Sequence, residues 1–474
     1  MIRPNQIAGR KNSRLRVPRP PPMGSEASLR ALLFPLPLFE LAVFFIPSSL
    51  AVRTAAIGQN FLFHISYFSR EISVNLEIVS EKLTSSPDKL DIRTFDPAGH
   101  DPLAYSHDVH AHGCPIAHDD AGDIVIVGHD EVTRVAQDAE TFSSAVSRYL
   151  QIPNGLDGDK HSAFRRLLDN YLNADEVARY SADFHRVARE VIDGYLADAP
   201  AAGDEVSVDA VQDLGYDFAV RAMVAWLGWP RAIEPRLKEW VEKNAAATRS
   251  GQQHRTARVA QEYDEIINEV VGEVRAAGQD CVTYRLINDT SLGRELEFEE
   301  IVSILRNWTG GDLGSMAKCV GVLLHALAKN TAMQERIRSG VSSEELVALV
   351  DEILRIDDPF VSNRRVTTCP ATVGGKQVDE GQRVYLHWTA ANRDPETFAD
   401  PDGFDPEGNA EKNLVWGTGP HACPGKDLSM VEIGAFVAEL LAVTTVQASS
   451  QAGAERDEHP VGGWSSLPIT LQRR

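Results

Sequence analysis

The sequence predicts a mainly helical protein that also carries a few small β-sheets. Six segments repeat apolar residues at three- and four-residue spacing, which is the period of a helix with one buried face. Strand-like runs are few, and most of them fall near residues 371–390 and at the C-terminal end. The six predicted helical segments are 174–197, 207–227, 233–246, 257–277, 298–329 and 343–356.

The first predicted elements of this fold lie between residues 95 and 140. From about Phe95 the composition becomes an acidic mixture with regular helix and strand signals, and it keeps that character to the C-terminus. Residues 122–128 are a β-branched run between two glycines, which predicts a strand. Residues 130–138 predict a helix that is entered through an acidic cap. We therefore expect one folded domain over residues 95–474.

Residues 1–94 are expected to form a poorly patterned extension. Residues 1–30 carry seven basic residues against one acid, and residues 31–52 are apolar but interrupted by prolines and Glu40. A membrane-spanning helix needs about 20 largely uninterrupted apolar residues, so this segment is a poor candidate. Three interpretations stay open: a signal-anchor or membrane-associating leader, an Arg-rich organelle-targeting peptide, and an extension without a role.

The composition excludes several classes of protein. Of the 474 residues, 43% are hydrophobic and 24% are charged, which is enough for a large core and excludes intrinsic disorder. The net charge of −21 argues against a general nucleic-acid-binding surface. The five cysteines include no Cys-x-x-Cys pair, which indicates a reducing compartment. We expect a cytoplasmic protein or, alternatively, one that associates with a membrane through its N-terminal apolar segment.

The most informative window is residues 414–432, which contains Cys423. Gly417, Gly419 and Gly425 allow a tight loop with the cysteine at its tip, and an apolar-faced helix begins directly after it. The positive end of that helix favours a thiolate, which is the form of cysteine that binds metals. One sulfur ligand without a Cys or His partner at zinc spacing suits an axial heme ligand. The alternative is a buried structural cysteine in a glycine-rich turn.

The full spacing Trp-Gly-x-Gly-x-His-x-Cys-x-Gly over residues 416–425 resembles the heme-binding loop of the cytochrome P-450 superfamily, the heme-thiolate monooxygenases. That family usually has Phe where this chain has Trp416. The resemblance implies that Cys423 is the axial ligand and that Trp416 and Gly417 belong to the cofactor-binding loop. It also implies that His421 is a further hydrogen-bond donor to the heme.

A second motif lies upstream, where Glu352 and Arg355 are three apart on a predicted helix and can pair on one face. In the resembled family, this ion pair braces the fold on the cysteine side of the heme. Residues 364–406 resemble the family's strand and meander region, in which Arg365 matches an arginine that pairs with a heme propionate. The family often completes the Glu–Arg network with an arginine after Phe-Asp-Pro, and this chain has Gly408 there.

Residues 158–167 resemble the family's His-x-x-x-Arg helix. His161 and Arg165 are four apart, so on a helix both side chains could reach one anionic group. The resemblance identifies that group as a heme propionate. A surface or helix-capping role is the alternative for His161.

Two adjacent glycines lie in the middle of the helix predicted over residues 298–329, at a cost of about 1 kcal/mol each relative to alanine. In the resembled family this helix crosses the distal face of the heme, where a glycine admits dioxygen and an acid–alcohol pair delivers protons. The chain departs from the family's order, because Leu313 occupies one position of that pair under either alignment. We expect Gly311 at the open position, Asp312 as the acid, and Thr309 or Ser315 as the hydroxyl. Alternatively, Asp312 only kinks or hydrates the helix.

The resemblance implies a mostly helical prism with a small β-region that encloses heme b, iron protoporphyrin IX, within residues 95–474. It implies a bacterial-type monooxygenase that inserts one atom of dioxygen into an apolar small organic substrate. Because no flavin or ferredoxin signature follows Cys423, the electrons would come from a separate ferredoxin or similar donor, for which Lys426 is a candidate docking point. Two alternatives remain: a peroxide-using or non-redox heme-thiolate enzyme, and a catalytically silent heme-binding protein.

Overall fold

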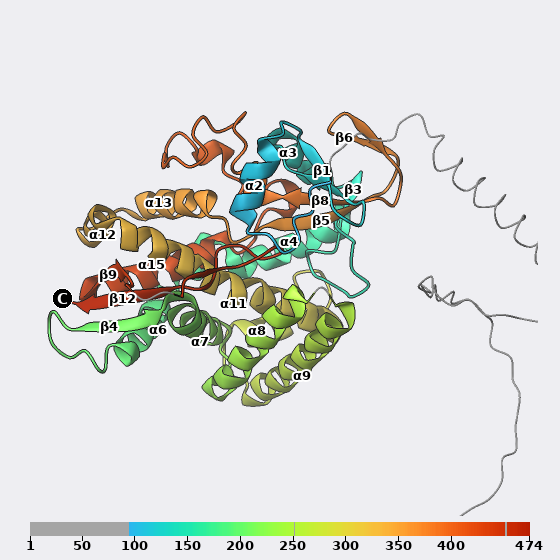
Figure 1. Ribbon diagram of the computed structural model, residues 1–474. Helices are drawn as coiled ribbons and strands as arrows, with labels where there is room; N and C mark the ends of the chain where they lie inside the picture. Colours follow the sequence, from blue (N-terminus) through green and yellow to red (C-terminus); the bar gives the residue numbers. More distant parts are fainter. Residues whose placement is uncertain (1–93, 251, 451–452) are drawn as a thin grey trace, which may run out of the picture. The chain divides into compact units, whose positions relative to one another are not determined.

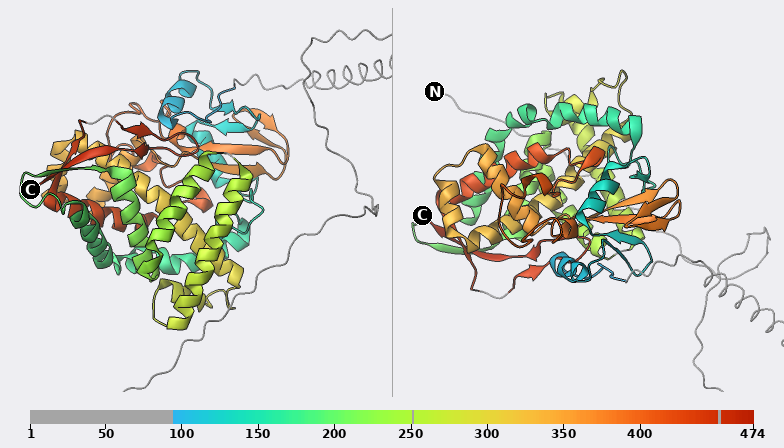
Figure 2. Two further views of the ribbon diagram at one scale, coloured as in Figure 1. Left: turned by 60° about the horizontal axis from the view of Figure 1, so that its bottom comes forward. Right: turned by 90° about the horizontal axis from the view of Figure 1, so that it is seen from above.

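The computed structural model describes residues 94–250, 252–450 and 453–474, and it confirms a mainly helical fold (Figure 1). The helices pack together as one body, and most of the short strands gather along one side of it (Figure 2). The α-helices are α2 (Pro102–His110), α3 (His129–Gln137), α4 (Gly158–Leu172), α5 (Ala174–Ala178), α6 (Ser181–Tyr195), α7 (Tyr216–Leu227), α8 (Glu234–Arg249), α9 (Gln253–Ala277), α10 (Val282–Ile287), α11 (Phe298–Lys329), α12 (Thr331–Arg338), α13 (Ser343–Ile356), α14 (Trp388–Ala391) and α15 (Lys426–Val443).

The largest sheet has five strands in the order β1-β2-β8-β5-β3, and only the β2–β8 pair is parallel. A three-stranded sheet joins β4, β12 and β9, and two hairpins complete the strands. The strands are β1 (Ile116–His118), β2 (Ile124–Ile126), β3 (Phe142–Ser143), β4 (Glu205–Asp209), β5 (Ser362–Thr367), β6 (Ala371–Val373), β7 (Lys376–Val378), β8 (Arg383–His387), β9 (Thr444–Ala448), β10 (Glu455–Arg456), β11 (Trp464–Ser466) and β12 (Pro468–Arg473).

Helix α11 is the central element of the helical body (Figure 1). It begins with a capping box, in which the Glu297 side chain accepts a hydrogen bond from a backbone N–H of the first turn and the Glu300 side chain accepts one from the Glu297 N–H. Most of its length is buried against α7, α9, α13 and the π-helical turn η1 (Ala210–Gly215). Because these elements pack around α11, they fix the position of its exposed stretch near Gly311.

The predicted helices over residues 298–329 and 343–356 coincide with α11 and α13. The segment 174–197 is divided into α5 and α6, with Arg179 and Tyr180 between them. The helix predicted over 207–227 is wrong at its start, because β4 pairs with β12 and Asp209 then caps the π-helical turn η1. The acidic cap predicted for residues 130–138 is also wrong: Gly128 is the N-cap of α3, and Asp130 lies in its first turn.

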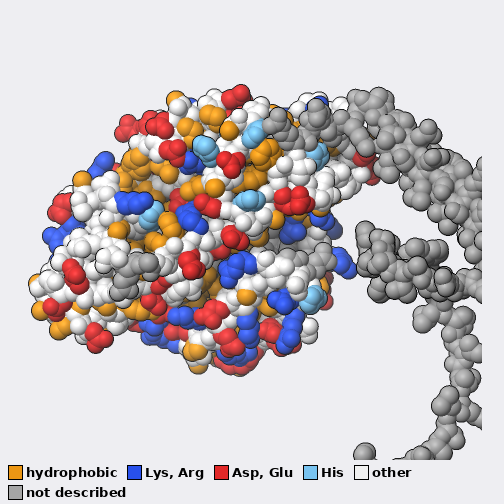
Figure 3. Space-filling view, viewed as in Figure 1, with side chains coloured by type: hydrophobic (Ala, Val, Ile, Leu, Met, Phe, Trp, Pro, Cys, Tyr) orange, Lys and Arg blue, Asp and Glu red, His pale blue; other side chains and the backbone are white. Residues whose placement is uncertain are grey.

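The predicted extension, residues 1–94, lies outside the described residues except for Thr94. Thr94 forms a bridge with His118, and the Phe95 amide donates to the His118 carbonyl, so the described chain begins with sheet pairing. Among the described residues, no helix is long and apolar enough to cross a membrane. Acidic and basic side chains are interspersed over the face shown in Figure 3, which presents no broad basic patch.

Candidate functional site

Cys423 lies in a tight loop between the short helix η4 (Gly419–His421) and α15. The Cys423 amide donates to the Trp416 carbonyl at 2.8 Å, which closes the loop. Gly419 has φ +73°, and a Cβ there would meet the Ala136 carbonyl oxygen at 2.6 Å. Glycine is therefore required at this position both by its backbone angle and by the approach of α3.

The Cys423 side chain is exposed, because it opens towards a cavity bounded by the loop, α11 and β5. Protein encloses it on its other sides, and this burial raises the pKa of the Cys423 thiol. The Gly425 N–H, Arg165 and Lys426 lower the pKa but do not outweigh burial. The start of α15 thus lowers the pKa of the Cys423 thiol, in the direction that the sequence predicts, but burial raises this pKa by more.

The cavity in front of Cys423 has walls of aromatic and aliphatic side chains with a few polar groups between them. Helix α11 contributes Gly311 and Asp312, so two of the predicted distal residues face the same cavity as the cysteine. The predicted loop residues Trp416, Gly417 and His421 line it too. Further lining residues are Leu172, Trp226, Asn307, Trp308, Phe360, Asn363, Arg365, Trp388, Val415 and Leu428.

The four predicted propionate-binding residues fall into one region. His161 and Arg165 lie on α4, and the Arg165 guanidinium donates to the Ala422 carbonyl at 2.6 Å. The His161 and His421 rings are 4.2 Å apart, centroid to centroid. His421 is not a free donor, since its Nε2 lies 3.2 Å from the carboxylate of Asp157. Burial lowers the pKa of both histidines, and that of His421 falls to about 4.

The environment of these donors tests whether a heme fits. Arg365 is 6% exposed, and no carboxylate of the described residues lies within 4.0 Å of its guanidinium. Its side chain reaches the Arg364 carbonyl, and desolvation lowers the pKa of Arg365 to about 10. The Nε2 atom of His161 is buried without a partner among the described residues. A buried cation and a buried donor that lack an anion are groups that would hold the propionates of a heme bound in this cavity.

The open face of α11 provides a second test of fit. A Cβ added at Gly310, Gly311 or Gly314 would meet nothing within 4 Å, so this face of a central helix borders free space. Ser315, half-buried on the same face, donates its hydroxyl to the Gly311 carbonyl at 2.5 Å. Thr309 is fully buried and donates to the Leu305 carbonyl at 2.7 Å. Of the two predicted hydroxyls, the structure therefore places Ser315 beside the open face and Thr309 away from it.

Asp312 and a residue that the sequence did not single out, Glu432 on α15, are both buried. Burial raises the pKa of Asp312 to about 7. Glu432 lies on the stripe of α15 that also buries Leu428 and Phe436. An acid on an apolar stripe was the signal that could have identified Glu432 from the sequence.

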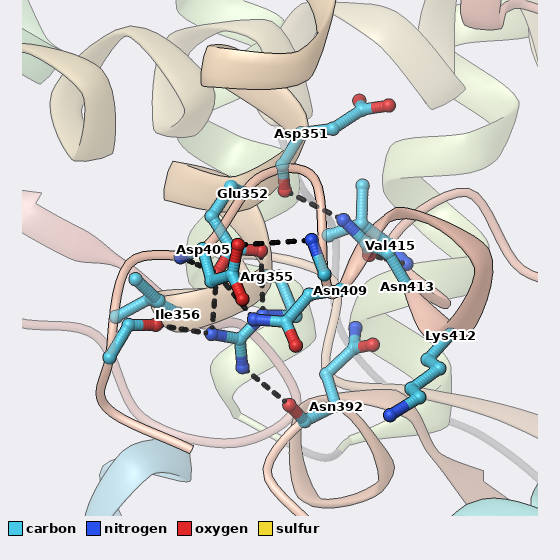
Figure 4. A network of polar contacts seen from close by, with 12 residues as sticks. Asp351, Glu352, Arg355, Ile356, Asn392, Asp405, Asn409, Lys412, Asn413 and Val415 are labelled. Carbon is cyan, nitrogen blue, oxygen red and sulfur yellow. Dashed lines mark hydrogen bonds and ion pairs between the residues drawn. The ribbon is translucent and has the colours of Figure 1, made fainter. Parts of the chain in front are cut away.

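The predicted Glu352–Arg355 pair is confirmed, and it is the centre of a larger network (Figure 4). Two guanidinium nitrogens of Arg355 donate to the Glu352 carboxylate at 2.8 and 2.9 Å, and the remaining donors reach backbone carbonyls of the meander. The Asn409 side chain donates to Glu352 at 2.8 Å. Asn409 thereby completes the network next to Gly408, where the resembled family often has an arginine.

Lys426, the candidate docking point, is already engaged. Its ammonium donates to the Asp351 carboxylate at 2.9 Å and lies 5.7 Å from the centre of the Trp416 ring. The Trp416 indole donates to the other oxygen of Asp351 at 2.6 Å. Asp351 therefore fixes both ends of the cysteine loop from α13, and it is a second residue that the sequence did not single out.

No comparable site is formed, among the described residues, by the His-rich residues 107–114 or by Cys319 and Cys369. Among the described residues, no set of three His, Cys, Asp or Glu side chains could hold a metal ion, including the His-rich residues 107–114. Cys319 is buried, and Cys369 is exposed.

Comparisons with known proteins agree with this geometry. The family model described as Cytochrome P450 matches residues 240–471. Cyclomarin C epoxidase CymV of Salinispora arenicola (strain CNS-205) is 28% identical over 321 residues, which is 64% of this chain and 79% of that protein. The structure of CYP109Q5 from Chondromyces apiculatus matches with a TM-score of 0.68 and 21% identity, covering 79% of this chain and 96% of that chain. The structure of CYP101C1 matches with a TM-score of 0.70 and 22% identity, covering 82% and 100%. The fold is that of cytochromes P450, and the chain belongs to this superfamily of heme-thiolate monooxygenases.

Proposed function

We propose that Cys423 is the axial thiolate ligand of a heme b seated in the cavity between its loop and α11. One observation carries this proposal: the Cys423 side chain opens into a cavity that also receives Arg365, a buried guanidinium without a carboxylate partner. Arg365 and Arg165 would pair with the propionates, with His161 as a neutral donor beside them and the His421 ring packed against His161. Trp416 and Gly417 would form the wall of the cofactor-binding loop.

When bound, the heme supplies dioxygen binding and the electron-transfer chemistry of oxygen insertion. The chain's own residues supply space and protons. The glycines of α11 leave room at Gly311 for a small ligand, and Ser315 presents a hydroxyl on the same face. Asp312 would be the acid that lines the cavity. The Glu352–Arg355 network and Asp351 would hold the cysteine loop in register with α13.

The substrate would be an apolar small organic molecule. Trp308, Phe360 and Val415 form much of the cavity wall, while Asn307 and Asn363 offer a few hydrogen bonds that could orient a polar group on the substrate. One related protein is named as an epoxidase of cyclomarin C, and one similar structure is titled as a complex with erythromycin B. Those names describe the relatives, and we take from them only the class of organic molecule.

The electrons would come from a separate protein such as a ferredoxin, and residues 95–474 would be the heme-thiolate catalytic domain. Because Lys426 is tied to Asp351, it would hold the cysteine loop rather than act as a free docking charge.

All five cysteines are free thiols, which supports a reducing, cytoplasmic location. Association with a membrane through residues 31–52 is the alternative.

Isotope-labelled dioxygen tests this function. The purified holoenzyme is screened with apolar compounds for a substrate-induced spectral shift, and compounds that bind are incubated with a surrogate ferredoxin, its reductase and labelled dioxygen. We expect one labelled oxygen atom in the product. Turnover with hydrogen peroxide but not with dioxygen and electrons would favour a peroxide-using enzyme instead. Binding without turnover under either condition would contradict the proposal and favour a catalytically silent heme protein.

A further inference from the structure

A second cavity lies between α6, α7, α9 and the start of α10, and its volume is about 460 Å³. Small-molecule sites in proteins commonly have volumes of roughly 300–1,000 Å³. In the part of the chain that the structure describes, no residue lines both this cavity and the Cys423 cavity. Helix α7 contributes Val224 and Ala225 to the second cavity and Trp226 to the Cys423 cavity. The second cavity is therefore a separate site, although one helix borders both.

The wall formed by the end of α7 and the start of α10 is held in place by two contacts. Gly228 has φ +72°, and a Cβ there would meet the Cβ of Cys281 at 2.3 Å. The Trp229 indole donates to the Thr283 hydroxyl at 2.8 Å, and both residues are buried. Because both contacts join residues of the chain itself, this wall keeps its shape, and binding a ligand there would cost little ordering of the chain.

The larger part of the cavity wall is apolar, and charged side chains are placed within it. An apolar wall suits the hydrocarbon body of an organic ligand, and the few charged groups then select its polar group. Arginines outnumber glutamates by three to two, so the wall has an excess of one positive charge, which one negative charge on a ligand would balance. The charged lining residues are Arg186, Arg221, Arg231, Glu234 and Glu273.

Arg221 is the arginine of this wall whose guanidinium makes no hydrogen bond with the described residues. The carboxylates within 4.0 Å of it are those of Asp217, at 3.9 Å, and Glu234, at 3.7 Å. Each of these acids has a closer cation, since Lys238 lies 2.7 Å from Asp217 and Arg231 lies 3.1 Å from Glu234. The N–H donors of Arg221 therefore remain for a planar carboxylate, which a guanidinium can bind through two parallel hydrogen bonds.

We propose that this cavity is a second ligand site, which binds a small organic carboxylate with an apolar body. The Arg221 guanidinium would hold the carboxylate, and Val224, Trp229 and Val274 would contact the body of the ligand. A carboxylate carries the single negative charge that balances the wall, whereas a phosphate would bring more than one. The site does not depend on the function proposed above, because no residue of the Cys423 cavity takes part in it.

Isothermal titration calorimetry of the full-length protein with 2-naphthoate as the probe tests this site. We expect 2-naphthoate to bind the wild type and Arg236→Leu with equal affinity, and to bind Arg221→Leu about 10- to 100-fold more weakly. Arg236 is the matched control, because it is an exposed arginine of α8 that pairs with Glu269 and lines neither cavity. No binding to the wild type, or equal binding to Arg221→Leu, would overturn the proposal.

Neutral and cationic relatives of the probe test the required charge without any variant. We expect 2-naphthamide, which keeps the ring but has no charge, to bind the wild type about 10- to 100-fold more weakly than 2-naphthoate. The cation 2-naphthylmethylamine should bind more weakly still, because it would meet the excess positive charge of the wall. Equal affinity for the three compounds would show that the probe binds through its ring alone and would overturn the role of Arg221.

Alkylation of Cys281 locates the bound probe, because this half-buried thiol lines the cavity. Cys369 is the internal control, since it is exposed and lies outside the cavity. With 2-naphthoate at about ten times its Kd, we expect N-ethylmaleimide to modify Cys281 about tenfold more slowly and Cys369 at an unchanged rate, as measured by peptide mass spectrometry. An unchanged rate at Cys281, or equal slowing at both cysteines, would overturn the placement of the ligand in this cavity.

Discussion

Arg364 and Arg365 are neighbours on β5 with opposite environments. Arg365 is buried at the cavity without a carboxylate partner, and Arg364 is exposed. If Arg365 pairs with a propionate, Arg365→Leu removes charge-assisted hydrogen bonds that are worth about 1.5–3 kcal/mol. We expect the variant to lose heme to apomyoglobin roughly 10- to 100-fold faster than the wild type. Arg364→Leu is the control, and equal rates for the two variants would contradict the assignment.

Variants of Ser315 and Thr309 distinguish the two candidates for the distal hydroxyl. Ser315→Ala removes the hydroxyl on the open face of α11, and we expect product per electron consumed to fall by about tenfold or more, with the remaining electrons recovered as hydrogen peroxide. Thr309→Val keeps the shape of a buried side chain that faces away from the cavity. We expect Thr309→Val to lower stability but to keep the coupling of electrons to product. The reverse pattern would assign the hydroxyl to Thr309.

At the scale of residues, the sequence predicted side chains that carry a local spacing signal. The cysteine loop, the Glu352–Arg355 pair and the His161–Arg165 spacing are of this kind, and the structure brings the loop, Arg365 and α4 together. Asp157, Asp351 and Asn409 were missed, because their roles depend on partners distant in the sequence. The choice between Thr309 and Ser315 also needed the structure, since both lie on one helix and only burial distinguishes them.

At the scale of elements, α13 carries a buried ion pair between Glu352 and Arg355. Glu352 is 2% exposed and Arg355 is 0% exposed, so Glu352→Gln leaves a buried guanidinium without its counter-charge. We expect the melting temperature to fall by an amount that corresponds to about 3–5 kcal/mol. The exposed pair of Arg336 and Glu345 is the control, and Glu345→Gln should cost about 0–1 kcal/mol. Similar losses in both variants would contradict the bracing role.

Helices with uninterrupted periodicity could be predicted to the residue, whereas elements set by distant partners could not. Residues 298–329 and 343–356 carry their own caps and apolar stripes, so α11 and α13 form where the pattern predicts. Residues 207–209 have a pattern that is also compatible with a helix, but they pair with β12, more than 250 residues later. Tertiary pairing overrides local pattern at that position.

For the whole molecule, the domain boundary is a prediction that truncation tests. The described chain begins with Thr94 and Phe95 paired to His118, and the Tyr105 hydroxyl donates to the Phe95 carbonyl. We expect a chain without residues 1–93 to keep its heme content and melting temperature. A chain without residues 1–101 loses these contacts and should melt at a lower temperature. A loss of heme on removal of residues 1–93 alone would contradict an independent domain over 95–474.

Across the whole molecule, the site combines segments from α4, α11, β5 and the cysteine loop. The family resemblance predicted that these segments meet, and the cavity with Gly311, Arg365 and Cys423 in its walls is consistent with it. Which acids are buried in the core depends on how α11 and α15 pack, as Asp312 and Glu432 show. Local sequence patterns therefore predict the elements and the cysteine loop, and packing decides which acids are buried.

The central claim is that Cys423 binds heme iron as a thiolate, and the absorption spectrum of the dithionite-reduced, carbon-monoxide-treated protein tests it most directly. We predict the strongly red-shifted Soret band of a thiolate-ligated complex in the wild type and its loss in Cys423→Ser. Cys369→Ser, which changes an exposed cysteine outside the cavity, should keep the band. A red-shifted band that survives in Cys423→Ser, or a folded wild-type protein without any heme band, would contradict the account.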